Sequence, residues 1–180
     1  DIFVDDDGEA YHVRTGFDVV RLNPEYTGAA EHMSNFSTPK PSEAPVMFRR
    51  SGLYYILPGT GCCGCVGGSN IYVFTAESPR GPWQFRGDVG STPGHAFDPH
   101  SPDNYVTWAQ ASAVLAIDGQ ILWMGNQWNS GLRETPPGPR KHDLLYWTVL
   151  RFEEDGDVRQ VEHAENCSFT LPPSERRGGE

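Results

Sequence analysis

The 180-residue sequence has no long apolar run and little positive charge. No segment approaches the roughly 18 consecutive apolar residues of a membrane-spanning helix. Lys and Arg number 14 against 24 Asp and Glu, giving a formal net charge of −10. Because clustered Lys and Arg bind nucleic acids and anionic membranes, neither is an expected partner. The chain opens at Asp1 with neither a Met nor a charged-then-apolar leader, so a leader could have preceded it.

Cysteine is scarce outside one short stretch. Three of the four cysteines lie in residues 61–65, GCCGC, and the fourth is Cys167. A zinc site usually has two separated Cys/His pairs, and the second pair is missing, so neither a metal nor another cofactor is predicted. One or two disulfides in an extracellular or periplasmic protein are the better interpretation, with Cys167 tied back to the chain. Sequons at Asn35 and Asn166 are compatible with secretion.

No stretch shows the periodicity of an amphipathic helix. Instead, 20 Gly and 15 Pro punctuate short β-type runs, which predicts many turns. Glycine turns predict hairpins over residues 2–13, 44–57, 111–125 and 144–161, the last with strands at 144–152 and 158–161. Further strands are expected at 17–22 and 70–76, with a short edge at 81–85. The acidic triplet 5–7 lacks the spacing of a calcium loop, and we expect a solvated turn there.

The remaining segments are polar and rich in Pro or Gly. Residues 25–42 and 87–103 are expected to be loops, the first at the rim of the fold, where ligand contacts concentrate. The folded domain is expected to span residues 1–163, followed by a polar C-terminal tail at 164–180 whose last nine residues are expected to be disordered.

The order of these elements recurs along the chain as a strand, a glycine turn, an aromatic-rich strand, a long loop and another strand. Such repetition without helices favours blades of four-stranded sheet. The predicted fold class is therefore all-β and the predicted architecture a β-propeller, with a β-sandwich as the alternative.

Several short blocks, in order, resemble glycoside hydrolase family 43 over residues 1 to about 163. They are FVDDDGEAY (3–11), EAPVMF (43–48) with GLYY (52–55), and SPRGPW (78–83). Two later blocks are similar, more narrowly, to the galactan 1,3-β-galactosidase branch of that family: MGNQWN (124–129) and LYW (145–147).

The resemblance implies a five-bladed β-propeller, of which this chain would carry about three blades. It implies an inverting glycosidase acting on β-1,3-galactan or a related plant or algal polysaccharide, with Glu43 as the general acid. Inversion also needs a group about 6.5–9.5 Å from the acid that activates water on the opposite face of the sugar. In the galactanase branch a Gln stands where that base is expected, and Gln110 occupies the matching place.

The residues themselves are compatible with this site. Glu43 and Gln110 each stand just before a strand at the start of successive blade-like units, so they could be neighbours in space. The C–H face of a pyranose packs on indole, and Trp108 and Trp128, with Asn126 and Gln127, are the predicted substrate-binding residues. The branch has an Asp-Arg pair where this sequence has Asn126 and Gln127. The other three tryptophans sit in strand patterns and are expected in the core: Trp83, Trp123 and Trp147.

Alternatives stay open on the residues alone. Glu43 could be an exposed residue before Ala-Pro, Gln110 a hydrogen-bonding loop residue, and Trp128 a packing residue. The chain could then be a carbohydrate-binding propeller or an inactive fragment that kept the scaffold without the chemistry. A third hypothesis is self-association through open sheet edges, because unpaired strand edges favour pairing with another chain.

Overall fold

The computed structural model describes residues 1–60, 64, 67–95, 104–129 and 143–171. These residues form three antiparallel sheets and no helix. The first sheet contains β1 (Ile2–Val4), β2 (Ala10–Val13), β3 (Asp18–Leu22) and β4 (Ala29–Asn35). The second contains β5 (Glu43–Arg50), β6 (Leu53–Gly59), β7 (Tyr72–Ala76) and β8 (Gln84–Asp88). The third contains β9 (Gln110–Ile117), β10 (Gln120–Gln127) and β11 (Leu144–Leu150).

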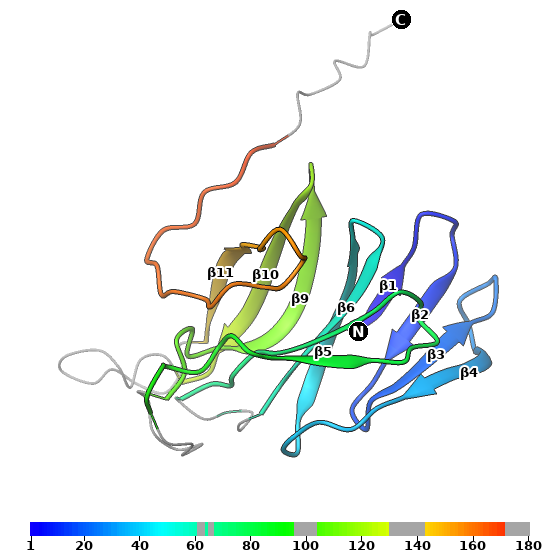
Figure 1. Cartoon of the computed structure of the whole chain (residues 1–180), viewed down its shortest axis with the longest axis horizontal. Coiled ribbons are helices and arrows are strands. Elements are labelled where there is room, and N and C mark those ends of the chain that lie inside the picture. Colours follow the sequence, from blue (N-terminus) through cyan, green and yellow to red (C-terminus); the bar gives the residue numbers. More distant parts are fainter. Residues whose placement is uncertain (61–63, 65–66, 96–103, 130–142, 172–180) are drawn as a thin grey trace, which may run out of the picture.

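Each sheet is a meander, so strands that follow one another in the chain are neighbours in the sheet. The three sheets stand next to one another, with the first strand of the second sheet, β5, running along both β1 and β9 (Figure 1). The all-β prediction is confirmed in the part of the chain that the structure describes.

Three strands of the second sheet, β5, β6 and β7, are buried on both faces. Side chains alternate along a strand, so neighbouring residues point to opposite faces. Those facing the third sheet join one core: Val46, Phe48, Tyr55, Leu57, Ile71 and Val73, packed with Trp123, Tyr146 and Leu150. Those facing the first sheet join a second core: Met47, Tyr54 and Ile56, packed with Tyr11, Val13 and Val19. This double burial explains the near-continuous apolar runs of β5, β6 and β7.

The predicted hairpins 2–13, 44–57 and 111–125 are present. The expected loop at 25–42 is wrong in part, because β4 lies within it and pairs with β3. Its side chains are largely exposed, as an edge strand permits, so its sequence carries no apolar alternation. Its anchors come from the loop between β7 and β8, where Trp83 Nε1 donates to Ser34 Oγ at 3.0 Å and Arg80 binds Glu31 through both guanidinium NH2 groups.

The expected strand at 158–161 is also wrong. Only an isolated bridge joins Phe152 to Val158, and the Val161 N–H donates instead to the carbonyl of Val89 at 2.9 Å. This segment therefore connects the third sheet to the second instead of completing the third.

Two side chains differ from expectation in burial. Trp147 is 42% exposed on β11, whereas Trp123 is fully buried as expected. Strand periodicity predicts which residues of β11 share a face with Trp147. It does not predict whether another sheet covers that face. Asp5 is only 6% exposed, so the turn after β1 is not fully solvated.

The described part of the tail, residues 164–171, lies on the third sheet. Thr170 and the Gln120 side chain exchange two hydrogen bonds, at 3.0 and 3.2 Å. Residues 172–180, expected to be disordered, lie outside the described residues, as do Cys62, Cys63 and Cys65. Cys167 is the one cysteine among the described residues, so the predicted disulfides stay a prediction.

Candidate functional site

Glu43 stands at the first position of β5, immediately before a β-bulge. Glu43 lies opposite Gly59 and Val46 lies opposite Leu57, so β5 has one more residue than β6 between these pairs. Ala44 takes a positive φ of 50°, and Pro45 donates no ladder hydrogen bond, which a bulge tolerates. A bulge changes the direction in which nearby side chains point, so it sets the direction of the Glu43 carboxyl.

Gln110 occupies the corresponding place on β9. Ala111 lies opposite Gly125 and Ala113 lies opposite Met124, which leaves Ser112 as the extra residue of a second bulge. β5 and β9 lie side by side, so their first residues meet at one end of the two sheets. The same irregularity at the start of both strands thus positions the two candidate residues.

A short hydrogen-bonded relay joins three of the predicted site residues. Gln110 Nε2 donates to Glu43 Oε1 at 2.8 Å, and Trp128 Nε1 donates to Gln110 Oε1 at 3.1 Å. An indole N–H can only donate, so the Gln110 amide oxygen has to face Trp128 and its NH2 group has to face Glu43. Gln110 is only 6% exposed, and the relay satisfies both ends of this buried amide.

The direct contact limits what Gln110 can do in this arrangement. An inverting pair is separated by about 6.5–9.5 Å because the sugar and a water lie between the two groups. At 2.8 Å, Gln110 acts on the Glu43 carboxyl itself. A proton on Glu43 has to sit on Oε2, since Oε1 faces an N–H donor.

The other predicted site residues lie at the same end of the third sheet. Asn126 pairs with Gln110 across β9 and β10, and the Gln127 side chain donates to the Thr107 carbonyl at 2.9 Å. Trp108, two residues before Gln110, is partly buried and packs against His163. The structure therefore brings the polar residues and Trp128 together, and it gives Gln127 a role in holding the loop before β9.

Two glycines make room for the start of β9. A Cβ on Gly68 would lie 2.2 Å from the Trp108 carbonyl carbon, and a Cβ on Gly125 would lie 2.8 Å from the Gln110 carbonyl oxygen. Ser69 N also donates to the Ala109 carbonyl at 3.2 Å. Gly68 and Gly125 therefore pack against the backbone next to Gln110, and neither position has room for a Cβ atom.

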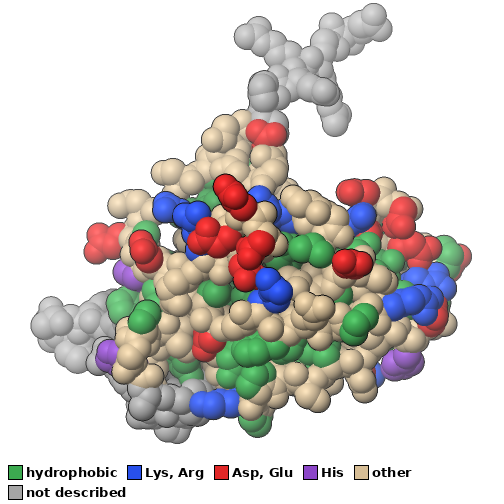
Figure 2. Space-filling view, viewed as in Figure 1, with side chains coloured by type: hydrophobic (Ala, Val, Ile, Leu, Met, Phe, Trp, Pro, Cys, Tyr) green, Lys and Arg blue, Asp and Glu red, His purple; other side chains and the backbone are tan. Residues whose placement is uncertain are grey.

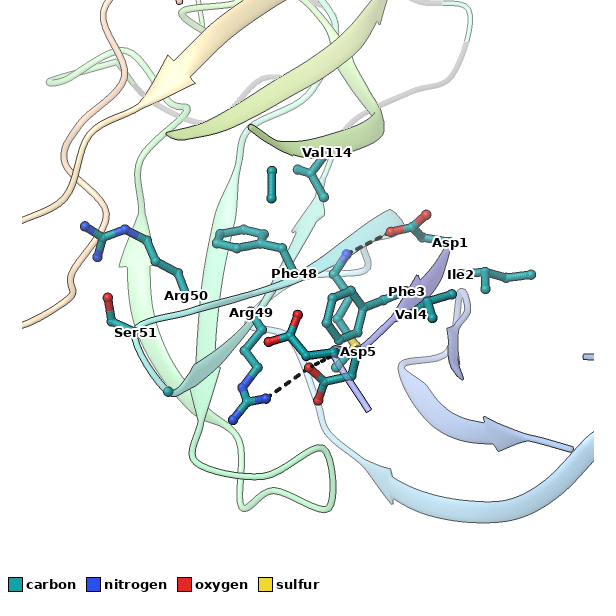
Figure 3. A pocket seen from close by; sticks show the side chains of 14 residues that line it. Asp1, Ile2, Phe3, Val4, Asp5, Phe48, Arg49, Arg50, Ser51 and Val114 are labelled. Carbon is teal, nitrogen blue, oxygen red and sulfur yellow. Dashed lines mark hydrogen bonds and ion pairs between the residues drawn. The ribbon is translucent and has the colours of Figure 1, made fainter. Parts of the chain in front are cut away.

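A cavity of about 510 Å³ lies between β1, β5 and β9 (Figure 3). Phe3, Met47, Phe48 and Val114 give it apolar walls, and neither Glu43 nor Gln110 lines it. The predicted hollow between Glu43 and Gln110, lined by indole rings, thus stays a prediction. Residues 61–63, 65–66, 96–103 and 130–142, which flank the site in sequence, lie outside the described residues.

Asp5 is the buried charge of this cavity. It accepts a hydrogen bond from Arg49 Nη1 at 3.0 Å (Figure 3). It accepts another from Tyr54 Oη at 2.5 Å. Burial raises the pKa of Asp5, but the hydrogen bonds from Tyr54, the Asp6 N–H and Arg49, with the charge of Arg49, outweigh it, so the pKa lies below its ordinary value. Burial and the same carboxylate raise the pKa of Tyr54.

Acidic and basic side chains lie side by side on the face shown in Figure 2, most densely around the segment that follows β11. Arg159 pairs with Glu153 at 2.9 Å, and Arg86 pairs with Asp157 at 2.6 Å. No three His, Cys, Asp or Glu side chains among the described residues form a group that could hold a metal ion. In the same residues, no helix is long and apolar enough to cross a membrane.

Sequence reasoning missed His163 and Thr107. His163 reaches the site from residues after β11, and Thr107 holds Gln127 through its backbone carbonyl. Neither residue belongs to a recognisable motif, because both contacts depend on how distant segments pack.

The sequence matches no protein-family model and no curated protein. The fold, in contrast, matches solved structures. A family 43 β-1,3-galactosidase bound to galactodeoxynojirimycin is 20% identical at a TM-score of 0.67, with 94% of this chain and 46% of that chain covered. An exo-β-1,3-galactanase from Clostridium thermocellum is also 20% identical at 0.67, with 88% and 32% covered. One from Phanerochaete chrysosporium, bound to galactose, is 20% identical at 0.64, with 89% and 34% covered.

This chain spans about a third to a half of the length of those proteins. It has the fold of the corresponding part of glycoside hydrolase family 43 enzymes of the β-1,3-galactosidase type.

Proposed function

We propose that this chain is part of an inverting glycoside hydrolase that acts on β-1,3-galactan or a related polysaccharide. The observation that carries the proposal is the relay from Trp128 through Gln110 to Glu43. It lies at the starts of two adjacent strands, in a fold shared with β-1,3-galactosidases. A carboxyl beside an indole is the combination that a sugar site needs, because one side chain supplies a proton and the other a flat apolar face.

In the proposed mechanism Glu43 donates the proton on Oε2 to the glycosidic oxygen as the bond to the anomeric carbon breaks. Gln110 holds the carboxyl through Oε1 before the sugar binds, and it positions the attacking water if the sugar separates the two side chains. An amide is not a base, so the proton released by the water has to pass to another group or to solvent.

The proposed architecture is an incomplete β-propeller in which the three sheets are blades. β1, β5 and β9 would be the innermost strands, since β5 runs along both of the others. The outer faces of the first and third sheets would then pack against further blades of a longer protein. Secretion to the extracellular space or periplasm is proposed on the sequons and the cysteine usage.

The test is hydrolysis of β-1,3-galactotriose by the chain and by its Glu43→Gln variant. Glutamine keeps an acceptor for Gln110 but cannot protonate the leaving oxygen, so we expect about a 10²- to 10⁴-fold loss of rate and an unchanged melting temperature. The anomer first released, measured by NMR, reports inversion. Equal rates for the two proteins would contradict the role of Glu43.

Carbohydrate binding without hydrolysis is the second candidate. One observation favours it: the described side chains brought to Glu43 are an amide and an indole, with no second carboxylate hydrogen-bonded to the pair. Calorimetric titration with the same trisaccharide separates the two. Binding without release of reducing sugar, unchanged by Glu43→Gln, would establish a binding module.

A further inference from the structure

Residues 158–164, which follow β11, are fixed on both sides of His163. Before it, the Gln160 side chain donates to the carbonyls of Val89 and Ser91, both at 3.0 Å. After it, the Ala164 N–H donates to the Tyr146 hydroxyl at 3.0 Å. The segment thus spans from the second sheet to the third, and its path fixes where the His163 side chain begins.

His163 is an exposed residue whose ring contacts two aromatic rings. Its centroid lies 4.6 Å from that of Trp108, with the planes inclined at 43°, and 5.4 Å from that of Tyr146, with the planes inclined at 21°. Its Nδ1 lies 3.2 Å from the Val106 carbonyl oxygen. A carbonyl oxygen only accepts, so Nδ1 carries the proton and the ring orientation is set.

Trp108 needs such support. It adopts a positive φ of 52°, a conformation that is costly for a bulky side chain and persists only where its surroundings enforce it. Gly68 packs against its backbone and His163 packs against its ring. Trp108 is partly exposed as a whole residue.

We propose that His163 is a positioning residue of the candidate sugar site, which holds the indole of Trp108 ready for the apolar face of a galactopyranose unit. This inference rests on the proposed function for the identity of the ligand, but the contact between His163 and Trp108 can be tested separately. An indole that is fixed before binding does not have to be immobilised by the sugar, so affinity is higher than with a free side chain.

The first test measures binding of β-1,3-galactotriose by calorimetry to the wild type, His163→Ala, His163→Phe and His32→Ala. Losing the ring should weaken binding about two- to tenfold, whereas Phe should restore most of it. His32 is exposed on β4 in the first sheet and serves as the control, with unchanged affinity expected. Wild-type affinity in His163→Ala, or equal losses in His163→Ala and His163→Phe, would overturn the proposal.

The second test is acrylamide quenching of tryptophan fluorescence in the wild type, His163→Ala, Trp108→Phe and the double variant. The His163 ring packs against the Trp108 indole, so removing it should increase quenching in the wild-type background and leave quenching unchanged in the Trp108→Phe background. Equal quenching of the wild type and His163→Ala would show that His163 does not hold Trp108 and would overturn the proposal. If His163→Ala increases quenching through Trp108 but the wild type binds no trisaccharide, the proposed function fails while the positioning contact stands.

Discussion

At the scale of single residues, Asp5 ties the first sheet to the second. It lies in the turn between β1 and β2, and its two side-chain partners, Arg49 and Tyr54, belong to β5 and β6. A nearly buried carboxylate with these hydrogen-bond partners stabilises the fold. Removing the carboxylate or one of its partners leaves a buried polar group without a hydrogen bond, which is costly.

Asp5→Asn should therefore lower the free energy of unfolding at pH 7 by about 2–3 kcal/mol. The folded pKa of Asp5 lies below the ordinary value, so the unfolded chain takes up the proton first as the pH falls. The stability that Asp5 contributes is thus complete above about pH 5 and is lost as the pH drops through the folded pKa. Urea unfolding from pH 6 to pH 3 should show a smaller loss of stability in Asp5→Asn than in the wild type; parallel curves would contradict this assignment.

Two buried hydroxyls near the site should respond in opposite ways to deletion. Ser69 Oγ has no hydrogen-bond partner among the described residues, whereas Thr60 Oγ1 donates to Asn70 Oδ1 at 2.8 Å. Removing an unsatisfied hydroxyl removes a desolvation cost, so Ser69→Ala should leave the free energy of unfolding unchanged or raise it by about 1 kcal/mol. Thr60→Val should lower it by about 1–3 kcal/mol. Chemical denaturation measures both; a clear destabilisation by Ser69→Ala would show that its hydroxyl is satisfied.

At the scale of elements, the close approach of β10 to the start of β9 depends on Gly125. An added Cβ would lie 2.6 Å from the Trp123 ring as well as close to the Gln110 backbone. Gly125→Ala should cost about 1–3 kcal/mol of stability through overpacking and should weaken trisaccharide binding by displacing Gln110. Gly28→Ala is the matched control, because its Cβ would come no nearer than 3.9 Å to any atom. Equal melting temperatures for the two variants would show that β10 can shift without cost.

The hairpins were predictable because local chemistry determines them. Gly8, Gly52 and Gly119 each take a positive φ in a turn between two β-type runs. β4 was not predictable, because a polar edge strand is defined by the backbone that pairs with it. Residues 158–161 have the composition of a strand, yet their backbone partners are divided between Arg151 and Phe152, just after β11, and Val89, just after β8.

The site was predictable in part. Resemblance indicated Glu43 and Gln110, but their hydrogen bond depends on the packing of β5 against β9. The two bulges that position them were not predictable, because a bulge is an extra residue in one strand relative to the strand with which it pairs. The burial of Asp5 and the contacts of His163 were not predictable, because their partners lie 44 to 57 residues away.

At the scale of the whole molecule, β11 is an edge strand with apolar side chains in solvent. Leu145 and Trp147 are 59% and 42% exposed and lie two residues apart, so they share one face. An exposed apolar edge favours pairing with another chain, and Lys at such positions opposes it. We expect the isolated chain to associate with rising concentration.

Leu145→Lys and Trp147→Lys should each reduce that association, whereas Gln84→Lys on the edge strand β8 should not. Sedimentation velocity over a range of concentrations measures the effect. A wild type that stays monomeric at every concentration would rule out association through this edge.

The extra residue in β5 makes the orientation of the acid depend on chain length. If Ala44 or Pro45 were deleted, Glu43 could still pair with Gly59 and Val46 with Leu57, yet the bulge that sets the direction of the Glu43 carboxyl would be lost. A single-codon deletion could thus silence the chemistry in a descendant gene while its strands and cores persisted, and a single-codon insertion could bring the chemistry back.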